Sequence, residues 1–337
     1  MIYHTSGLVA DANVTHADKS VPHFPPPLEA AIERFRAWNK DNLKSEDEKS
    51  KIITPLYHYT DARGLRGIFE NQQIWFTDYR HLNDPSELLH GMQAAQEVAS
   101  RMKSGADTRA QLFLDCFVDM FRRENFDKTL EFYVASFSRA GNDLGQWRAY
   151  ADNGRGFAIG FAPQLFETVE SLPTDKPPEF VGPVKYTLED VDALYTPPIV
   201  EAARVFLAQA VVYADLMKDK SIGIPFVQEM VRELMTTLIW RSLTTKHPAY
   251  QNEQEVRLVI LGSPPRLSPY VKTRLRGSEI VPYIRQPWAA RGPCNVVEII
   301  VGPAASPDTE RTLRKFLSTL SMDFDNIRRS DIPYRAV

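Results

Sequence analysis

Segments of two kinds follow one another irregularly along this chain, and their order constrains the fold more than any other feature of the sequence. Short runs rich in aromatic and β-branched residues predict strands. Longer runs with apolar residues at three- and four-residue steps predict helices. The predicted strands are 55–60, 74–78, 131–138, 154–161, 255–261 and 296–301. The predicted helices are 28–42, 61–69, 84–103, 108–123, 198–218, 225–244 and 308–320. Because regular strand–helix–strand alternation is missing, the sequence predicts an α+β domain with a mixed or antiparallel sheet, not a doubly wound one.

The sequence also predicts how the chain is divided. Residues 1–27 are polar and predict a loose arm, and the charged stretch 44–51 after the first helix predicts a solvated linker. We therefore expect an N-terminal arm and helix over residues 1–51 and one main domain over 52–337. Residues 172–183 are rich in proline and predict a loop. The helices of about 198–244 form the largest insertion in the main domain.

Composition excludes several classes of protein. With 337 residues, 43% of them hydrophobic and 25% charged, the chain is an ordinary globular protein able to bury a core. A net charge of -3 gives no overall attraction to nucleic acid or to an anionic membrane. Cys116 and Cys294 provide neither a disulfide framework nor a zinc cluster. No signal peptide and no apolar stretch of membrane-spanning length is found, so we expect a cytoplasmic protein without a membrane partner, with delivery by a specialised secretion system left open.

His58 ends the first predicted strand, directly before a helix that Asp61 can cap. An imidazole in this position can direct a ring nitrogen into a cleft and donate a hydrogen bond to a hydroxyl or carbonyl of a ligand. A histidine that is hydrogen-bonded within the core is the alternative interpretation.

Ser136 and Ser138 lie on one face of the predicted strand 131–138, while Phe137 faces the other side. Two buried hydroxyls need partners, because each unpaired one costs about 1–3 kcal/mol. No Gly-x-Ser-x-Gly motif surrounds them, so an esterase-type nucleophile is not expected. The alternative is a strand that simply leaves the core for a polar turn.

Glu253 and Glu255 stand at the start of the strand 255–261. An extended backbone would put both carboxylates on the same side, roughly 6–7 Å apart. Their repulsion is tolerable if one contacts solvent or a cation and the other holds a substrate, and Lys246, His247 and Arg257 are the cations available nearby. An exposed acidic start of a strand is the alternative.

A metal site is the weaker interpretation of a third motif. His81, Asp84, Glu87 and His90 carry metal-ligating groups, and Glu87 and His90 are three residues apart on a predicted helix. Asp84 as a helix cap, with Glu87 completing a capping box, explains the same residues better. We therefore expect no metal.

The segment 143–150 supplies Trp147, Arg148 and Tyr150. Such a ring and a fixed cation suit an adenine or a diphosphate, although they also pack structurally. The Gly-Arg-Gly of residues 154–156 is too short for a phosphate loop, and neither a P-loop nor a G-x-G-x-x-G motif is present.

Together these motifs resemble a large bacterial family described only as a domain of unknown function. The similarity runs from about Leu56 to the C-terminus. It rests on Leu-Tyr-His-Tyr-Thr, Leu-Asn-Asp-Pro-Ser-Glu, Ser-Phe-Ser, Gln-Trp-Arg-Ala-Tyr, Glu-x-Glu-Val-Arg-Leu and Glu-Ile-Ile-Val-Gly-Pro. That family in turn resembles the ADP-ribosyltransferase superfamily, which implies a split-sheet core with helical insertions and NAD as the substrate.

The resemblance also implies roles for individual residues. His58 would contact the nicotinamide-side ribose or carboxamide, Ser136 would position His58 and the glutamate, Glu255 would bind a ribose hydroxyl, and Glu253 would orient the acceptor. Tyr59 and Trp147 are our choices for ring stacking. The residues expected to bind NAD are His58, Tyr59, Thr60, Ser136, Ser138, Trp147 and Arg148. In that superfamily the Glu-x-Glu motif is more usual together with Arg on the first strand, whereas this chain carries His there.

The function implied by the resemblance is transfer of ADP-ribose from NAD to a protein or nucleic-acid acceptor, in a toxin, effector or phage-defence protein. A carboxylate beside the ribose would stabilise the positive charge that develops as nicotinamide leaves. A sensor that binds NAD or a nucleotide without cleaving it, an NAD glycohydrolase, and an NAD-dependent enzyme that removes RNA phosphates are the alternatives.

Overall fold

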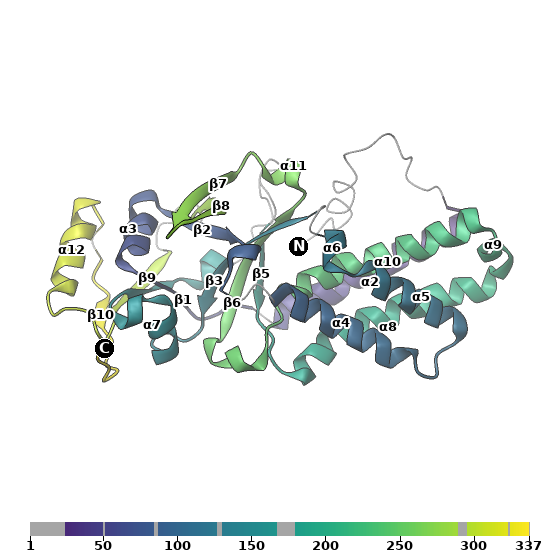
Figure 1. Cartoon of the computed structure of the whole chain (residues 1–337), viewed down its shortest axis with the longest axis horizontal. Helices are drawn as coiled ribbons and strands as arrows, with labels where there is room; N and C mark the ends of the chain where they lie inside the picture. The colour runs from purple at the N-terminus through teal and green to yellow at the C-terminus, as the bar shows by residue number, and fades with distance from the viewer. Residues whose placement is uncertain are drawn as a thin grey trace.

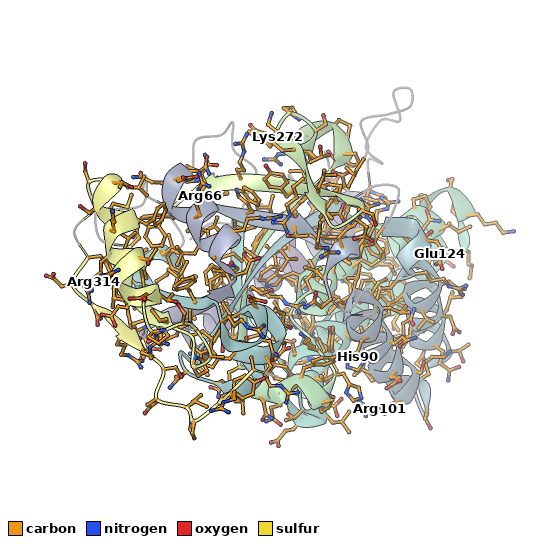
Figure 2. All side chains as sticks on the ribbon, turned by 60° about the vertical axis from the view of Figure 1, so that its left-hand side comes forward. Arg66, His90, Arg101, Glu124, Lys272 and Arg314 are labelled. Carbon is orange, nitrogen blue, oxygen red and sulfur yellow. The ribbon has the colours of Figure 1, made fainter. Side chains whose placement is uncertain are left out.

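A computed structural model of the chain describes residues 24–49, 51–83, 87–126, 130–166, 179–288, 295–322 and 324–336. Within these ranges the protein is α+β, with a mixed, mostly antiparallel sheet of ten strands at one end and a helical bundle at the other (Figure 1). In the turned view of Figure 2, Arg66 and Arg314 lie on the side of the sheet, whereas Arg101 and Glu124 lie on the side of the bundle.

The sheet is built mainly from neighbours that run antiparallel. Its strands are β1 (Leu56–Thr60), β2 (Gln73–Asp78), β3 (Glu131–Ser138), β4 (Phe157–Phe161), β5 (Glu179–Pro183), β6 (Glu255–Gly262), β7 (Val271–Arg276), β8 (Glu279–Pro287), β9 (Val296–Val301) and β10 (Ile327–Arg329). The main path has the order β10-β9-β4-β1-β3-β2-β8-β7, and β6 joins it by pairing with β3 on one side and β5 on the other. Only β9 and β10 pair in parallel among the described strands.

The sheet forks at β3. One edge of β3 pairs with β6 along its whole length, from Glu131 to Ser138. The other edge pairs with β2 only at Tyr133 and Val134, and with β1 only at Ser138. Between these two pairings the strands β1 and β2 diverge, which leaves the backbone around Ser136 without a strand neighbour on that edge.

The helical bundle covers one face of the central strands. It consists of α2 (Pro26–Lys49), α4 (Glu87–Lys103), α5 (Thr108–Met120), α8 (Leu188–Val212) and α10 (Lys220–Ser242), with the short α9 (Ala214–Lys218) between the last two. Phe132 and Val134 of β3 are buried in the same apolar core as the bundle. The helix expected in the N-terminal region, α2, buries Leu28 and Phe35 in this core.

The opposite face of the same strands builds a second core. Tyr133, Ala135 and Phe137 of β3 pack there, together with α3 (Ala62–Asn71) and α12 (Thr309–Thr319). The two-residue alternation of β3 therefore divides its side chains between two cores. A third, small cluster forms around Trp147 of α7 (Leu144–Tyr150).

Most predicted elements are confirmed, and the differences have physical causes. Strand β3 has the predicted bounds, and Asp61 caps α3 by accepting a hydrogen bond from the backbone N–H of Gly64. Strand β4 begins at Phe157, later than predicted, because Asp152–Gly154 forms a 3₁₀ turn (η3). Helix α8 begins at Leu188, capped by Thr187, and runs through the two prolines at which we expected a helix to start.

Three other predictions were wrong or fall outside the described residues. Residues 179–183, expected within a proline-rich loop, form β5, an edge strand in which Pro183 is tolerated. The charged stretch predicted as a linker continues α2 as far as Lys49. The cap predicted at Asp84 lies outside the described residues. No helix of the described part of the chain is long and apolar enough to cross a membrane.

Candidate functional site

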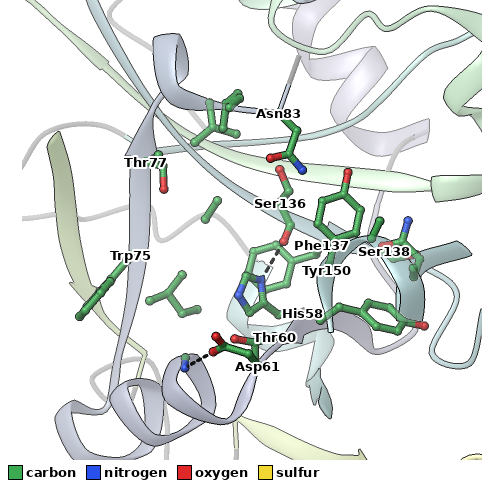
Figure 3. A pocket seen from close by; sticks show the side chains of 18 of the residues that line it. His58, Thr60, Asp61, Trp75, Thr77, Asn83, Ser136, Phe137, Ser138 and Tyr150 are labelled. Carbon is green, nitrogen blue, oxygen red and sulfur yellow. Dashed lines mark hydrogen bonds between the residues drawn. The ribbon is translucent and has the colours of Figure 1, made fainter. Parts of the chain in front are cut away.

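A cavity of about 780 Å³ opens at the fork of the sheet. That volume lies in the usual range for sites that bind small molecules or cofactors. Its wall includes His58 of β1 and Ser136 of β3 (Figure 3). It also includes Glu255 of β6, and the three residues are far apart in the sequence. Tyr59, Thr60, Ser138, Arg148 and Glu253 also line it, whereas Trp147 does not.

His58 fills the gap that the diverging strands leave beside Ser136. Its Nδ1 lies 3.0 Å from the backbone oxygen of Ser136 (Figure 3). Because a carbonyl can only accept, Nδ1 carries the proton in the neutral ring, and Nε2 is left with a lone pair. Burial lowers the pKa of His58, and the charge of Arg274 adds to this effect, while the hydrogen bond to Ser136 opposes it. In the neutral imidazole, Nε2 can therefore accept a hydrogen bond from a ligand. From the sequence we expected a ring nitrogen that donates one.

Ser136 and Ser138 make different contacts. Ser138 donates to the backbone oxygen of Glu253 at 2.7 Å and accepts from the backbone N–H of Ala140 at 3.0 Å, so it fixes the segment before β6 against β3. Ser136 instead lies near the carboxylate of Glu255 and helps to lower its pKa. Strand alternation puts both hydroxyls on the bundle side of β3 and the His58 ring beside Phe137, on the other side. The fork joins the two sides into one cavity.

Glu255 is held by two cations. Arg257 donates to both carboxylate oxygens, at 2.8 and 3.0 Å, and the ammonium of Lys246 donates at 3.2 Å. Burial alone would raise the pKa of Glu255, but Arg257, Lys246 and the hydroxyl of Ser136 lower it to about 2. Glu255 is thus ionised at every pH at which the protein would be assayed.

Glu253 reaches the same cluster by a different backbone path from the one expected. It ends the 3₁₀ helix η5 (Pro248–Glu253), and Gln254 has a left-handed backbone with φ of 45°. The extended backbone predicted between the two glutamates was therefore wrong, although their carboxylates do lie close together. Lys246 brings them together by donating to Glu253 at 2.6 Å as well as to Glu255, and Tyr150 donates to Glu253 at 2.8 Å.

The predicted compensation of charge is confirmed for two of the three cations. Lys246 and Arg257 contact the glutamates directly. His247 instead uses Nδ1 to accept a hydrogen bond from the backbone N–H of Ala249, at the start of η5. Two carboxylates and two cations balance, so this end of the cavity is polar but carries little net charge.

The aromatic residues chosen for stacking are engaged within the protein. Trp147 is fully buried and donates to the side chain of Asn142 at 2.9 Å. Tyr59 packs edge-on against Trp147 and donates to the backbone oxygen of Ala140 at 2.7 Å. Trp147 is therefore not accessible to a ligand in this structure, and its contacts dock α7 onto β1. Arg148, on the same helix, is exposed at the wall of the cavity.

The sequence analysis predicted the strand 74–78 but not β7, and it assigned no site residue to the part of the wall that β2 and β7 form. Trp75 and Thr77 of β2 line the cavity together with Arg274 of β7. The sequence signal was present, because Lys272, Arg274 and Arg276 alternate with other residues over 271–276, as expected for a strand with one basic face.

The described residues contain no cluster of His, Cys, Asp and Glu that could hold a metal ion. Of the four candidate ligands, Asp84 and the side chain of Glu87 lie outside the described residues. The ring of His90 lies 5.9 Å from that of His247, centroid to centroid.

Comparison with known proteins adds one relationship. No curated protein and no solved structure matches the chain. A family model matches residues 146–258, from α7 to the middle of β6, and this range contains Lys246, Glu253 and Glu255 but neither His58 nor Ser136. The chain thus carries, over residues 146–258, a region similar to the family described as protein of unknown function (DUF2971).

Proposed function

We propose that the cavity binds NAD and that the chain transfers ADP-ribose from NAD to a macromolecular acceptor. The observation that carries the proposal is that His58, Ser136 and Glu255 line one cavity of about 780 Å³. The ADP-ribosyltransferase-like core implied by the resemblance is part of this proposal, and a mixed sheet that forks at β3 is compatible with it.

In the proposed reaction the bond between the ribose and nicotinamide breaks and its electron pair leaves with nicotinamide. The ribose becomes an oxocarbenium-like cation, which a nucleophile of the acceptor attacks. Glu255, always ionised, would accept a hydrogen bond from a ribose hydroxyl, and Nε2 of His58 would accept one from another hydroxyl or from the carboxamide N–H. Glu253, whose side chain is 17% exposed, would orient the acceptor.

A second candidate is a domain that binds NAD or another nucleotide without cleaving it. The observation that favours it is the pairing of Glu255 with Arg257 and Lys246. A carboxylate already neutralised by two cations stabilises a further positive charge less than a free one does. An NAD glycohydrolase, with water as the acceptor, shares the geometry of the first candidate.

Incubation with NAD labelled in its adenylate part, in a cell lysate, separates these candidates. Label on protein or nucleic acid together with released nicotinamide supports the transferase. Free labelled ADP-ribose supports the glycohydrolase. Binding of NAD in calorimetry without release of nicotinamide supports the nucleotide-binding domain, and the absence of any binding at millimolar NAD contradicts all three.

A further inference from the structure

Arg274 forms part of the cavity wall and lies on the hairpin of β7 and β8. Its guanidinium lies over the rings of Trp75 and Tyr283, 5.2 and 5.7 Å from their centroids. It also donates to the hydroxyl of Thr77 at 2.9 Å. The contacting residues lie on β2 and β8, and β8 pairs with both β2 and β7, so they hold the plane of the guanidinium in one orientation.

This cation has no counter-ion among the described residues, although it is half-buried. Its strand neighbour Arg276 pairs with Glu279, and Arg257, which also lines the cavity, pairs with Glu255. No carboxylate of the described chain forms an ion pair with Arg274. Burial, followed by the charge of Arg276, lowers the pKa of Arg274, as expected for a charge that lacks compensation.

Two hydrogen-bond donors of this wall also lack partners. Nε of Arg274 and Nε1 of Trp75 are buried without a hydrogen-bond partner among the described residues. A buried donor without a partner costs about 1–3 kcal/mol, and a charged one costs more. Both residues line the cavity, so these two donors without partners lie within its wall.

We infer that Arg274 and Trp75 bind a phosphoryl group of the cavity's ligand. The fixed guanidinium supplies the positive charge and an unused N–H, and the indole supplies a second N–H from a neighbouring strand. A phosphoryl group has several oxygens that can accept from donors in different directions, which suits this arrangement. The inference rests on the proposed function in that it assigns the diphosphate of NAD to this wall, with the nicotinamide ribose toward Glu255.

Calorimetric titration with ADP and with adenosine tests the inference without any cleavage of NAD. The variants are Arg274→Ala and Arg274→Lys in the full chain. The matched control is Lys272→Ala, which removes an exposed cation of the same strand that does not line the cavity (Figure 2). The melting temperature of each free variant reports whether the hairpin is intact.

We expect Arg274→Ala to weaken ADP binding about 10- to 100-fold, because hydrogen bonds to charged groups contribute about 1.5–3 kcal/mol. Adenosine, which has no phosphoryl group, should bind the variant as it binds the wild type. Arg274→Lys should recover only part of the loss, since an ammonium cannot reproduce the planar donor geometry. Lys272→Ala should bind ADP normally.

Several outcomes would overturn the inference. Equal affinity of Arg274→Ala and the wild type for ADP contradicts it, and so does a wild type that binds neither ADP nor inorganic pyrophosphate. Binding of glutarate, a dicarboxylate, in preference to ADP would instead indicate a carboxylate site. If ADP binding depends on Arg274 while NAD is neither bound nor cleaved, the inference stands and the proposed function fails. If Arg274→Ala cleaves NAD with an unchanged KM, the proposed function stands and the inference about Arg274 fails.

Discussion

At the scale of the residue, Glu255 combines a fixed charge with a fixed position. Its bidentate contact with Arg257 and its contact with Lys246 leave it no freedom to rotate or to take up a proton near neutral pH. Such a group cannot act as a general acid or base at pH 7, because its pKa of about 2 lies far from the working pH. Its remaining capacity is to accept hydrogen bonds and to contribute negative charge.

The first prediction follows from that role. Glu255→Gln should release nicotinamide from NAD at least about 100-fold more slowly than the wild type, as expected when one charged contact to the transition state is lost. The control is Glu201→Gln, because Glu201 contacts Arg204 in the same bidentate way, at 2.8 and 2.6 Å, but lies on α8 and does not line the cavity. A folded Glu255→Gln protein, with a thermal transition like that of the control, that still cleaves NAD at the wild-type rate would contradict the assignment.

The second prediction concerns His58 and pH. Its pKa is lowered in the folded protein, so between that value and 6.5 the unfolded chain binds a proton that the folded one does not. The folded state therefore loses stability as the pH falls below about 6.5, by at most about 1.4 kcal/mol per pH unit, the slope of one proton.

His58→Asn is the matched variant, because its amide can still donate to the backbone oxygen of Ser136 but does not titrate. The free energy of unfolding in urea, measured from pH 5 to 8 for both proteins, should show a difference in slope that is confined to the acid side of this range. Parallel curves over the whole range would mean that the imidazole titrates normally.

Sequence patterns predicted which residues lie close together at the cavity better than how those residues are held. The compensation of Glu253 and Glu255 by Lys246 and Arg257 followed from charge and proximity. The path of the chain between the glutamates did not, because nothing in the residue type of Gln254 forces a positive φ. The burial of Trp147 could not be predicted from the sequence either, since a ring on a short helix can face the core or a ligand.

At the scale of the element, how well a strand could be predicted from the sequence depended on how far its side chains are buried. Strand β3 carries side chains that two cores bury, so its run of bulky residues gave its bounds. Strand β7, with the sequence Val-Lys-Thr-Arg-Leu-Arg, is largely exposed, so only the alternation of its basic residues indicates a strand. The wall that carries Arg274 was therefore the part of the cavity hardest to predict.

The third prediction concerns the crossing of α4 and α10. A Cβ atom on Gly91 would lie 2.5 Å from Cα and 2.6 Å from the carbonyl oxygen of Ser242, so the two backbones could not keep their distance. Gly91→Ala should lower the free energy of unfolding in urea by about 1–3 kcal/mol, the usual cost of overpacking.

Gly67→Ala is the control for helix propensity. A Cβ at Gly67, in α3, would meet no atom within 4 Å, so this substitution should stabilise the protein by about 0.5–1 kcal/mol. If both substitutions shifted the urea midpoint in the same direction, the close crossing of α4 and α10 would not explain the effect of an added methyl group at position 91.

At the scale of the whole molecule, the two cores are tied together by shared strands. Strand β3 contributes Phe132 and Val134 to the core of the bundle, and Tyr133 and Phe137 to the core on the other face. The apolar periodicity of α2 predicted that one side of this helix is buried, but it did not show which helices pack against that side. Its packing with α8 and α10, far along the chain, became visible only in the fold.

The last prediction tests whether the region similar to the DUF2971 family is a structural unit. Strand β4 lies inside residues 146–258, but both its neighbours, β1 and β9, lie outside. Strand β6 is cut at Leu258, and its partner β3 is missing from the fragment. The bundle also loses α2, α4 and α5, which bury much of the apolar surface of α8 and α10.

A fragment of residues 146–258 should therefore keep some helix but show no cooperative transition when urea unfolding is followed by circular dichroism, whereas the full chain should unfold in a sharp transition. A cooperative transition of the fragment, with near-ultraviolet signals of packed aromatic side chains, would show that the matched region folds alone. In that case His58 and Ser136 would be additions to a preformed unit. With the expected outcome, the cavity exists only where all the strands at the fork are assembled, because its three defining residues come from β1, β3 and β6.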